Sequence, residues 1–409
     1  RQANAFDAPA TNFSPEILMP VERTYSEWLH SAYNTSNGVY APQFAGNKSG
    51  GMVSSCQDCH MPDILGHGAD TNQYPSVPLR NNLPLHDMTG GSSWLSRLLP
   101  EYAGLSAEEG AALSNGAHRA EYMLQKAARM QATLEGTNLN VKVINDTGHK
   151  LPTGYPEGRR VWINLRFYDS EDHILAEHGG YDYSTGLLTN WTTRVYEVHP
   201  GIGTNLAAEV GVEPGPSLHF VLNNQIYEDN RIPPRGFNNS VYETFGGAPV
   251  GHHYEDGQYW DDALFEIPED AVRAHARLYY QSTSKEFVEF LYTNNVTDDA
   301  GTNLYNLWVE NDRCPPVLMT EAFWPEDFTI DSMWWLVDES LGIAFNSISG
   351  YTYWIEYADE LGSNTVWTPF LSNGLMESMG GQGAFTDDFT TATSGGEPAG
   401  GSRFYRIRR

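Results

Sequence analysis

The spacing of apolar side chains changes along the chain and divides it into three predicted parts. Residues 1–105 show little sustained periodicity and are rich in Pro, Gly, Asn and Ser. This composition predicts loops, with one short helix within 21–32. At Ser106 an Ala- and Leu-rich stretch begins with an N-cap serine and a capping-box glutamate, Glu109. We therefore expect a helix from there to about Leu134.

From residue 138 onward, apolar positions alternate with polar ones, as in strands that bury one face. Leu139, Val141 and Val143 begin the pattern. Further strand-like runs, separated by turn-rich segments, lie at 161–167, 193–198, 218–222, 274–280 and 287–291. The segment 169–172 has the composition of a hairpin turn. The number and spacing of these runs predict an antiparallel β-sandwich with long loops.

The pattern of apolar and polar positions changes for the last time near residues 325–332. Beyond it, strand-like runs lie at 342–345, 351–357 and 403–407, and a Gly/Ser/Thr-rich stretch interrupts them. The expected fold is therefore mainly β with an irregular and helical N-terminal segment. We expect the domains at 1–136 (short helices and one longer helix), 137–329 (antiparallel β-sandwich) and 330–409 (a small C-terminal β-sandwich module).

The chain is strongly acidic, and this narrows the classes of partner. Its 409 residues carry 24 Lys and Arg against 52 Asp and Glu, a formal net charge of −28. Such a charge excludes nucleic acid and opposes anionic membrane surfaces. No apolar run approaches the roughly 20 residues of a membrane helix. The chain begins at Arg1 with neither an initiating Met nor a signal peptide, so we expect a mature or processed chain.

The clearest chemical motif is the C-x-x-C-H formed by Cys56, Cys59 and His60. This is the attachment signature of c-type haem. The two thiols add to the haem vinyl groups, and the histidine directly after the second thiol ligates the iron. Two of the three cysteines in the chain lie in this motif. The sequence therefore predicts one covalent haem c, and covalent attachment implies an exported protein.

Three other interpretations of the cysteines are weaker. A zinc site requires further Cys or His pairs at ligand spacing, and the chain has no second C-x-x-C. A redox C-x-x-C is expected near a βαβ pattern, which the Gly- and Ser-rich flanks do not show. The third of these weaker interpretations is a disulfide. The remaining thiol, Cys314, is expected to be buried and inert.

A second histidine is needed to complete a bis-histidine iron site. His86 lies shortly downstream in the same loop-rich segment, and we favour it as the distal ligand. His149, in a Gly- and Pro-rich loop after the first sandwich strand, is the alternative. Met61 and Met88 are weaker candidates, since Met61 lies too close to His60 in sequence to reach the opposite haem face. The acidic loop of Glu255, Asp256, Asp261 and Asp262 is a weakly supported Ca²⁺ candidate without EF-hand spacing.

Several stretches of residues 20–325 resemble secreted bacterial multihaem c-type cytochromes in which haem-binding segments precede a C-terminal β-sandwich. They are SCQDCHMP, HDMTGG, NDTGHKLPTGYPEGRRVWINL, LHFVLNN, EDNRIPPRGF, YEDGQYWDD and YYQSTSKEFVEFL. The resemblance implies that His86 and His149 are distal haem ligands, sometimes of a neighbouring haem. This chain departs from the family because it has one C-x-x-C-H where relatives carry several.

The last module resembles, more loosely, the C-terminal β-sandwich modules of large secreted bacterial surface proteins. The similar stretches are IAFNSISGYTYWIEYADEL, WTPF and RFYRIRR. This resemblance implies a role in attachment or assembly, by analogy at the level of the class.

The expected function is electron transfer outside the cytoplasm, at the cell surface or in the periplasm. Two axial imidazoles leave iron no open position, so we expect a carrier and not an enzyme. Its partner would be a redox protein or neighbouring copies of the chain. A second hypothesis is a structural subunit of a surface filament or layer, including a polymeric cytochrome. A third is a haem enzyme with an open distal site, although no distal acid-base set is recognisable.

Overall fold

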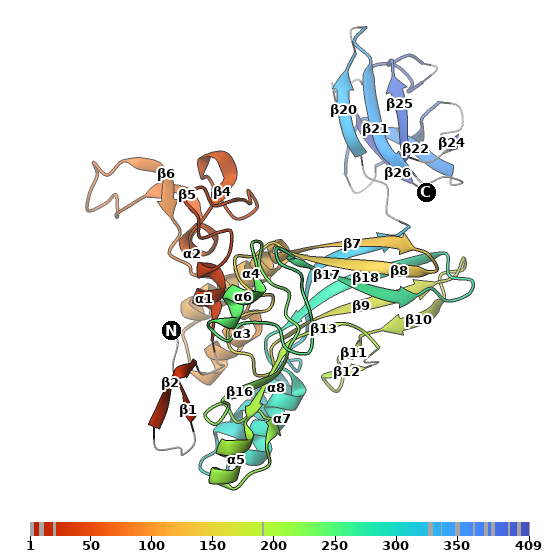
Figure 1. Cartoon of the computed structure of the whole chain (residues 1–409). Helices are drawn as coiled ribbons and strands as arrows, with labels where there is room; N and C mark the ends of the chain where they lie inside the picture. The colour runs from red at the N-terminus through yellow and green to blue at the C-terminus, as the bar shows by residue number, and fades with distance from the viewer. Residues whose placement is uncertain are drawn as a thin grey trace. The chain divides into compact units, whose positions relative to one another are not determined.

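The structure, a computed structural model, divides into two compact units, Arg1–Phe323 and Trp324–Arg409 (Figure 1). It describes residues 4–7, 12–18, 22–189, 192–325, 330–336, 338–347, 352–362, 365–371, 375–377, 381–391, 393–398 and 402–408. The boundary between the units lies six residues before the start expected for the C-terminal module. The other expected boundary, after residue 136, lies inside the first unit.

The N-terminal part of the first unit consists of short elements joined by turns, as its composition predicts. Its helices are α1 (Thr24–Leu29), the 3₁₀ turn η1 (Ser49–Gly51) and α2 (Cys56–His60). Its strands form three hairpins: β1 (Asn4–Asp7) with β2 (Asn12–Leu18), β3 (Val39–Tyr40) with β4 (Met52–Val53), and β5 (Asp63–His67) with β6 (Leu79–Pro84). A small cluster of buried side chains that includes Tyr33, Phe44 and Val53 supports α2.

Two helices, α3 (Ser93–Tyr102) and α4 (Ala107–Ala127), follow this part. The capping box predicted at Ser106 and Glu109 is present at the start of α4. The helix ends seven residues earlier than expected, because β7 (Ala128–Glu135) begins directly after it. β7 buries Ala128, Met130 and Ala132 on one face. The sequence pattern did not distinguish this strand from a continued helix, because Ala and Met are also good helix formers.

Two antiparallel sheets form the main body of the first unit. One has the order β17-β8-β7, with β8 at Asn138–Asn145 and β17 at Trp260–Glu266. The other has the order β10-β9-β18-β19, and β13 also pairs with β9. Its strands are β9 (Arg160–Tyr168), β10 (Ile174–His178), β13 (Val195–Tyr196), β18 (Arg273–Gln281) and β19 (Val317–Trp324).

The apolar faces of these two sheets supply the core. Val141 of β8 and Ile163 of β9 are fully buried. His178 of β10 lies against Phe265 of β17, with ring centroids 5.1 Å apart, so the sheets contact one another. Figure 1 shows β7 and β8 running along β9 and β18. The predicted mainly β fold is confirmed, and so is the hairpin turn between β9 and β10.

Long excursions between the strands carry the remaining elements of the first unit. They are β11 (Gly180–Asp182), β12 (Leu187–Thr189), β14 (Val198–Ile202), α5 (Thr204–Val210), β15 (Gly215–Pro216), β16 (Gln225–Asp229), α6 (Asn239–Glu243), α7 (Lys285–Asn294) and α8 (Ala300–Glu310). Two predicted strands were wrong. Residues 218–222 lie outside helices and strands, and 287–291 lie in α7, which Ser284 caps through its hydroxyl.

The second unit is a small β-module with its own core. Its strands are β20 (Ile330–Trp335), β21 (Leu341–Ser347), β22 (Thr352–Ala358), β23 (Thr368–Pro369), β24 (Leu375–Glu377), β25 (Gly381–Asp387) and β26 (Phe404–Arg408). They form the sheets β20-β21-β25 and β23-β22-β24, with β26 paired to β22. Ile343, Phe345 and Tyr353 are fully buried between them. Across the described residues of both units, none of the helices combines the length and apolarity needed to span a membrane.

Candidate haem site

The C-x-x-C-H motif forms the short helix α2, and a capping box closes the N-terminus of this helix. The Ser55 hydroxyl accepts from the backbone N–H of Asp58, and the Asp58 carboxylate accepts from that of Ser55 at 3.0 Å. Lys48 Nζ lies 2.9 Å from the same carboxylate. Residues three and four apart lie on one face of a helix. The fold of α2 therefore presents Cys56, Cys59 and His60 together.

Electrostatics fix the charge state of Asp58. Burial acts to raise the pKa of its carboxyl, but hydrogen bonds from Lys48, Ser54 and Ser55 outweigh this and lower the pKa to about 2. The carboxylate therefore stays ionised over the physiological range and holds the first turn of α2.

The two motif thiols differ in environment, and neither belongs to a cluster suited to zinc. Cys56 is exposed, whereas Cys59 is partly buried beside Tyr33 and Trp28. Burial raises the pKa of the Cys59 thiol to about 12, with the neighbouring Asp58 adding to the effect. A thiol this weakly acidic is not a metal-binding or nucleophilic thiolate. Among the described residues, no group of three or more His, Cys, Asp or Glu side chains could hold a metal ion.

The His60 ring is oriented by a backbone carbonyl. Its Nδ1 donates to the carbonyl oxygen of Thr89 at 2.6 Å. Thr89 belongs to the same segment as His86, and Asp87 in that segment pairs with Arg119 of α4 at 2.6 Å. The hydrogen bond at Nδ1 selects the tautomer whose Nε2 lone pair can ligate a metal.

His149 is held in an equivalent way by the loop after β8. Its Nδ1 lies 3.1 Å from the carbonyl oxygen of Lys150 and 3.2 Å from Thr147 Oγ1. Burial is the main cause that lowers the pKa of His149, so the ring is neutral near pH 7 and Nε2 carries a lone pair. Within the residues that the structure describes, no hydrogen bond engages Nε2 of His60 or of His149.

The loop that carries His149 is fastened at the end of β8. The side-chain amide of Asn145 donates to the carbonyl oxygens of His149, Ile232 and Pro233 at 2.8–3.0 Å. Gly148, which precedes His149 in this loop, lies close to the N-terminal segment. A Cβ added to Gly148 would be 3.2 Å from Trp28. These contacts bring the loop against the helix region that contains the C-x-x-C-H.

These contacts place the imidazoles of His60 and His149 close together. The ring centroids of His60 and His149 are 6.5 Å apart, and the ring planes differ by 22°. Iron–nitrogen bonds of about 2 Å on each side, added to the distance from each ligating nitrogen to its ring centre, require a separation of about 6 Å. The distance between the ring centres would therefore suit two imidazoles bound to one iron, and Cys56 and Cys59 lie on α2 with His60.

The other predicted ligand, His86, is placed differently. Its side chain is exposed between β6 and α3, and the ring found against His60 is that of His149. The His86 segment contributes the Thr89 carbonyl to the site instead of an imidazole. His30, another histidine of the N-terminal segment, stacks on Phe245 at 5.4 Å.

A buried charged cluster beneath the site has no counterpart in the sequence-based prediction. Lys150 Nζ lies 2.8 Å from Asp229, and Arg231 Nη2 lies 2.7 Å from the same carboxylate. Glu27 of α1 accepts from the backbone N–H of Lys150 at 3.0 Å and pairs with Arg231 at 3.3 Å. This cluster joins α1 to the His149 loop and thereby fixes the position of that loop. Its signal in the sequence is Lys150, which directly follows His149 and precedes Leu151 and Pro152.

The acidic loop proposed for Ca²⁺ is occupied by protein donors. Asp256 accepts from Asn238 and Asn239. Asp261 accepts from Tyr196 and pairs with Arg194. Of the other two residues, Asp262 lies 3.4 Å from Lys142, and Glu255 lies 3.1 Å from His253. These contacts give the carboxylates structural roles. Cys314 is buried, as expected.

Comparison with known proteins adds a weak structural likeness. No family model matches the chain, and no curated protein matches it. A solved structure with similar features is a penta-haem cytochrome c552 from Thermochromatium tepidum, at a TM-score of 0.37 and 15% identity. The match covers 72% of this chain and 53% of that cytochrome, so the chain spans about half of its length. A TM-score this low assigns neither a fold family nor a function.

Proposed function

We propose that this chain is an exported c-type cytochrome that transfers electrons through one covalent haem. Cys56 and Cys59 would form the thioether links, His60 would be the proximal ligand and His149 the distal one. The observation that carries the proposal is the 6.5 Å separation of the two imidazoles beside the thiols of α2. Haem supplies the one-electron chemistry when it is bound, and the protein residues hold and orient it.

The hydrogen bonds of the site support a six-coordinate iron. Both Nδ1 atoms are held by carbonyl oxygens, which favours the tautomer whose Nε2 lone pair is free to bind a metal. Two such ligands leave no open position for substrate, which favours a carrier over an enzyme. The exposed Cys56 lies at the protein surface, where a bound haem would be reachable by a redox partner.

The test is the optical spectrum of the purified whole chain, oxidised and reduced, with pyridine-haemochrome quantitation. We expect one haem per chain and a low-spin spectrum. His149→Ala should remove the sixth ligand and convert the haem to high spin, because no other described imidazole faces His60.

His86→Ala is the matched control, since His86 is exposed in the segment that was favoured from the sequence. It should keep the low-spin spectrum. A high-spin wild type, or a His86→Ala spectrum that changes while that of His149→Ala does not, would overturn the ligand assignment. A purified chain without haem would overturn the proposed function.

The net charge of the chain indicates the kind of redox protein that would bind it. A chain with a formal net charge of −28 attracts a redox protein with a basic face and repels an acidic one. Haem attachment takes place outside the cytoplasm, so we place this exchange at the cell surface or in the periplasm. Neighbouring copies of the chain are the alternative partner.

A further inference from the structure

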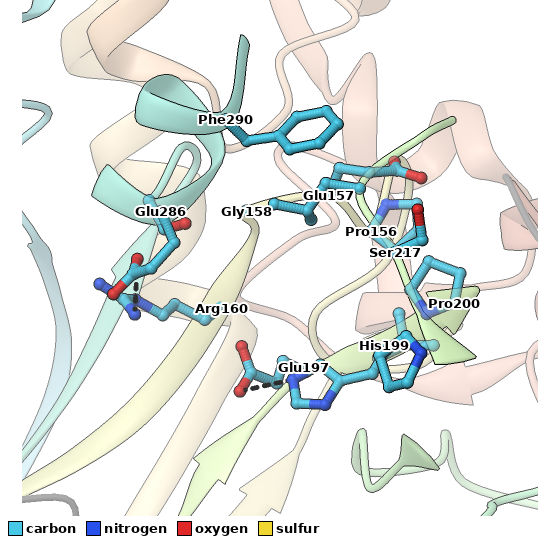
Figure 2. Close-up of a pocket in the computed structure, with 14 residues that line it drawn as sticks. Pro156, Glu157, Gly158, Arg160, Glu197, His199, Pro200, Ser217, Glu286 and Phe290 are labelled. Atoms are coloured by element: carbon cyan, nitrogen blue, oxygen red, sulfur yellow. Dashed lines mark ion pairs between the residues drawn. The ribbon is translucent and has the colours of Figure 1, made fainter. Parts of the chain in front are cut away.

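The first unit holds a cavity of about 570 Å³ that shares no lining residue with the proposed haem site (Figure 2). Two ion pairs lie on its wall. Arg160 lies 3.5 Å from Glu286, and His199 lies 3.0 Å from Glu197. These charges therefore have partners within the chain. One surface of the second unit differs, because its side chains are left without a counterpart among the described residues.

This surface is the edge of a sheet. In the order β20-β21-β25, β20 pairs with β21 along one side, and no described strand pairs with its other side (Figure 1). The backbone N–H and C=O groups of an unpaired edge can pair with a further strand, and native edges usually carry lysines, prolines or bulges that prevent this. The irregularity of β20 lies at its start, between Ile330 and Ser332. Residues 332–336 include no charged residue and no proline, and residues 324–409 contain no lysine.

The side chains of this stretch are large, apolar and exposed. Met333 is 52% exposed, Trp334 is 40% exposed and Trp335 is 68% exposed. Leu336, directly after the strand, is exposed as well. Aromatic residues and Met are enriched at protein interfaces, and contiguous apolar side chains on a surface mark an interaction site. The edge of β20 therefore has the features of a strand that pairs with another strand.

The register with β21 shows which side of the sheet these residues face. Met333 is opposite Ile343, and Trp335 is opposite Leu341. Directly opposite residues of an antiparallel pair face the same side of the sheet. Ile343 and Leu341 belong to the buried core of the unit. Met333 and Trp335 therefore face the core side, although both remain more than half exposed.

Trp334 faces the other side of the sheet. It is opposite Gly342 in the register, and a Cβ added to this glycine would collide with the Trp334 indole. The indole therefore lies across Gly342, where a larger residue would displace it. A strand that pairs with β20 must consequently offer apolar side chains on both of its faces.

We propose that β20 pairs antiparallel with β20 of a second copy of this chain, about a two-fold axis at Trp334. Identical strands related by a two-fold axis are self-complementary, since each offers the same groups to the other. In this register Met333 of each copy lies opposite Trp335 of the other, and a thioether beside an indole is a favourable contact. No charged residue between Ser332 and Leu336 meets another. The two three-stranded sheets then join into one continuous sheet.

The net charge of the chain gives this pairing a characteristic dependence on salt. Each copy carries a formal net charge of −28, so two copies repel one another at long range. Salt screens that repulsion, whereas strand pairing and apolar contacts act at short range. The dimer should therefore strengthen as ionic strength rises. It does not require haem, because β20 belongs to the second unit and the residues of the proposed haem site belong to the first.

The experiment is sedimentation equilibrium of the whole protein over a range of concentrations, at low and at high salt. We expect an equilibrium between monomer and dimer that salt shifts toward the dimer. Met333→Lys places an ammonium opposite Trp335 of the second copy and should raise the dissociation constant about tenfold or more. Leu264→Lys is the matched control, since Leu264 is 56% exposed on β17, an edge strand of the first unit. It should leave the dissociation constant unchanged.

A cysteine cross-link tests the register without introducing a charge. In Trp334→Cys the two thiols would face each other across the axis, with Cβ atoms about 4.5–5.5 Å apart, a short movement from disulfide geometry. Oxidation should then give a covalent dimer, which neither the wild type nor Leu264→Cys should form.

A monomer at every concentration and salt would overturn the proposal and leave a strand of another protein as the occupant of the β20 edge. A dimer that Met333→Lys leaves intact would place the interface elsewhere. Cross-linking of the wild type or of Leu264→Cys as readily as of Trp334→Cys would contradict the assigned register.

Discussion

At the scale of single residues, the proposed haem site depends on side chains that hold α2 and the His149 loop in place. Asp58 is one of them, because its carboxylate accepts from two backbone N–H groups and pairs with Lys48. A folded-state pKa of about 2 lies below the unfolded value near 3.9. Asp58 therefore contributes stability above pH 4, and this contribution is lost as pH falls toward 2.

Replacing Asp58 with Asn removes the charge and keeps the shape. We expect the free energy of unfolding at pH 7 to fall by about 1 kcal/mol, the usual cost of losing a helix cap. In urea titrations, the difference between the wild type and Asp58→Asn should shrink between pH 4 and pH 2. A difference that stays constant over that range would contradict the assigned role of the carboxylate.

Gly148 allows the loop that carries His149 to lie close to Trp28 and Tyr33. An added Cβ would lie 3.2 Å from Trp28 Cδ1 and 3.3 Å from Tyr33 Cγ. We therefore expect Gly148→Ala to displace His149 and to introduce a high-spin fraction into the optical spectrum. Gly116→Ala, in the middle of α4, is the control. It should leave the spectrum unchanged and raise the stability by about 0.5–1 kcal/mol.

At the scale of elements, the buried charges join α1 to the loop after β8. Lys150 and Asp229 are both fully buried, 2.8 Å apart. Replacing Lys150 with Met leaves Asp229 with Arg231 as its remaining partner. Breaking a buried pair costs about 3–5 kcal/mol, and we expect a loss of that size in urea unfolding. Lys285→Met, which breaks a surface pair with Glu289, should cost less than about 1 kcal/mol. Equal losses would show that the cluster does not hold the loop.

Elements with strong local signals could be predicted from the sequence. The capping box of Ser106 and Glu109 begins α4, and the alternation that starts at Leu139 marks β8. The run at 287–291 was assigned to a strand, because a short apolar run fits either period. Its helix depends on the Ser284 cap and on burial of Val288.

The proximity of His149 to His60 could not be predicted from local sequence. His86 lies closer to the C-x-x-C-H along the chain, which made it the first choice. His149 is brought to His60 by contacts between distant segments, including the amide of Asn145 with the carbonyl of Pro233 and Glu27 with Lys150. Such long-range contacts leave no periodicity that a sequence pattern could reveal.

At the scale of the whole molecule, the chain divides into two compact units. The core of the second unit is built from its own side chains, among them Ile343, Phe345 and Tyr353. The residues of the proposed haem site all lie in the first unit. We therefore expect a chain cut after Phe323 to fold, to incorporate haem and to keep the spectrum of the whole protein.

The measurement is the haem stoichiometry and thermal unfolding of residues 1–323 beside those of the full chain. The full chain should show one transition more than the shortened chain, and that transition should be absent when the second unit is removed. A shortened chain that is high-spin or unfolded would show that the second unit is needed for the haem site.

The hydrogen bonds of the two imidazoles have a consequence for the reduction potential of the proposed haem. A ring whose Nδ1–H is held by a carbonyl oxygen is a stronger electron donor through Nε2, and Thr89 and Lys150 supply such carbonyls on the two sides. Stronger donation stabilises ferric over ferrous iron and makes the reduction potential more negative. Backbone carbonyls do not titrate, so this tuning would persist unchanged from acidic to alkaline surroundings.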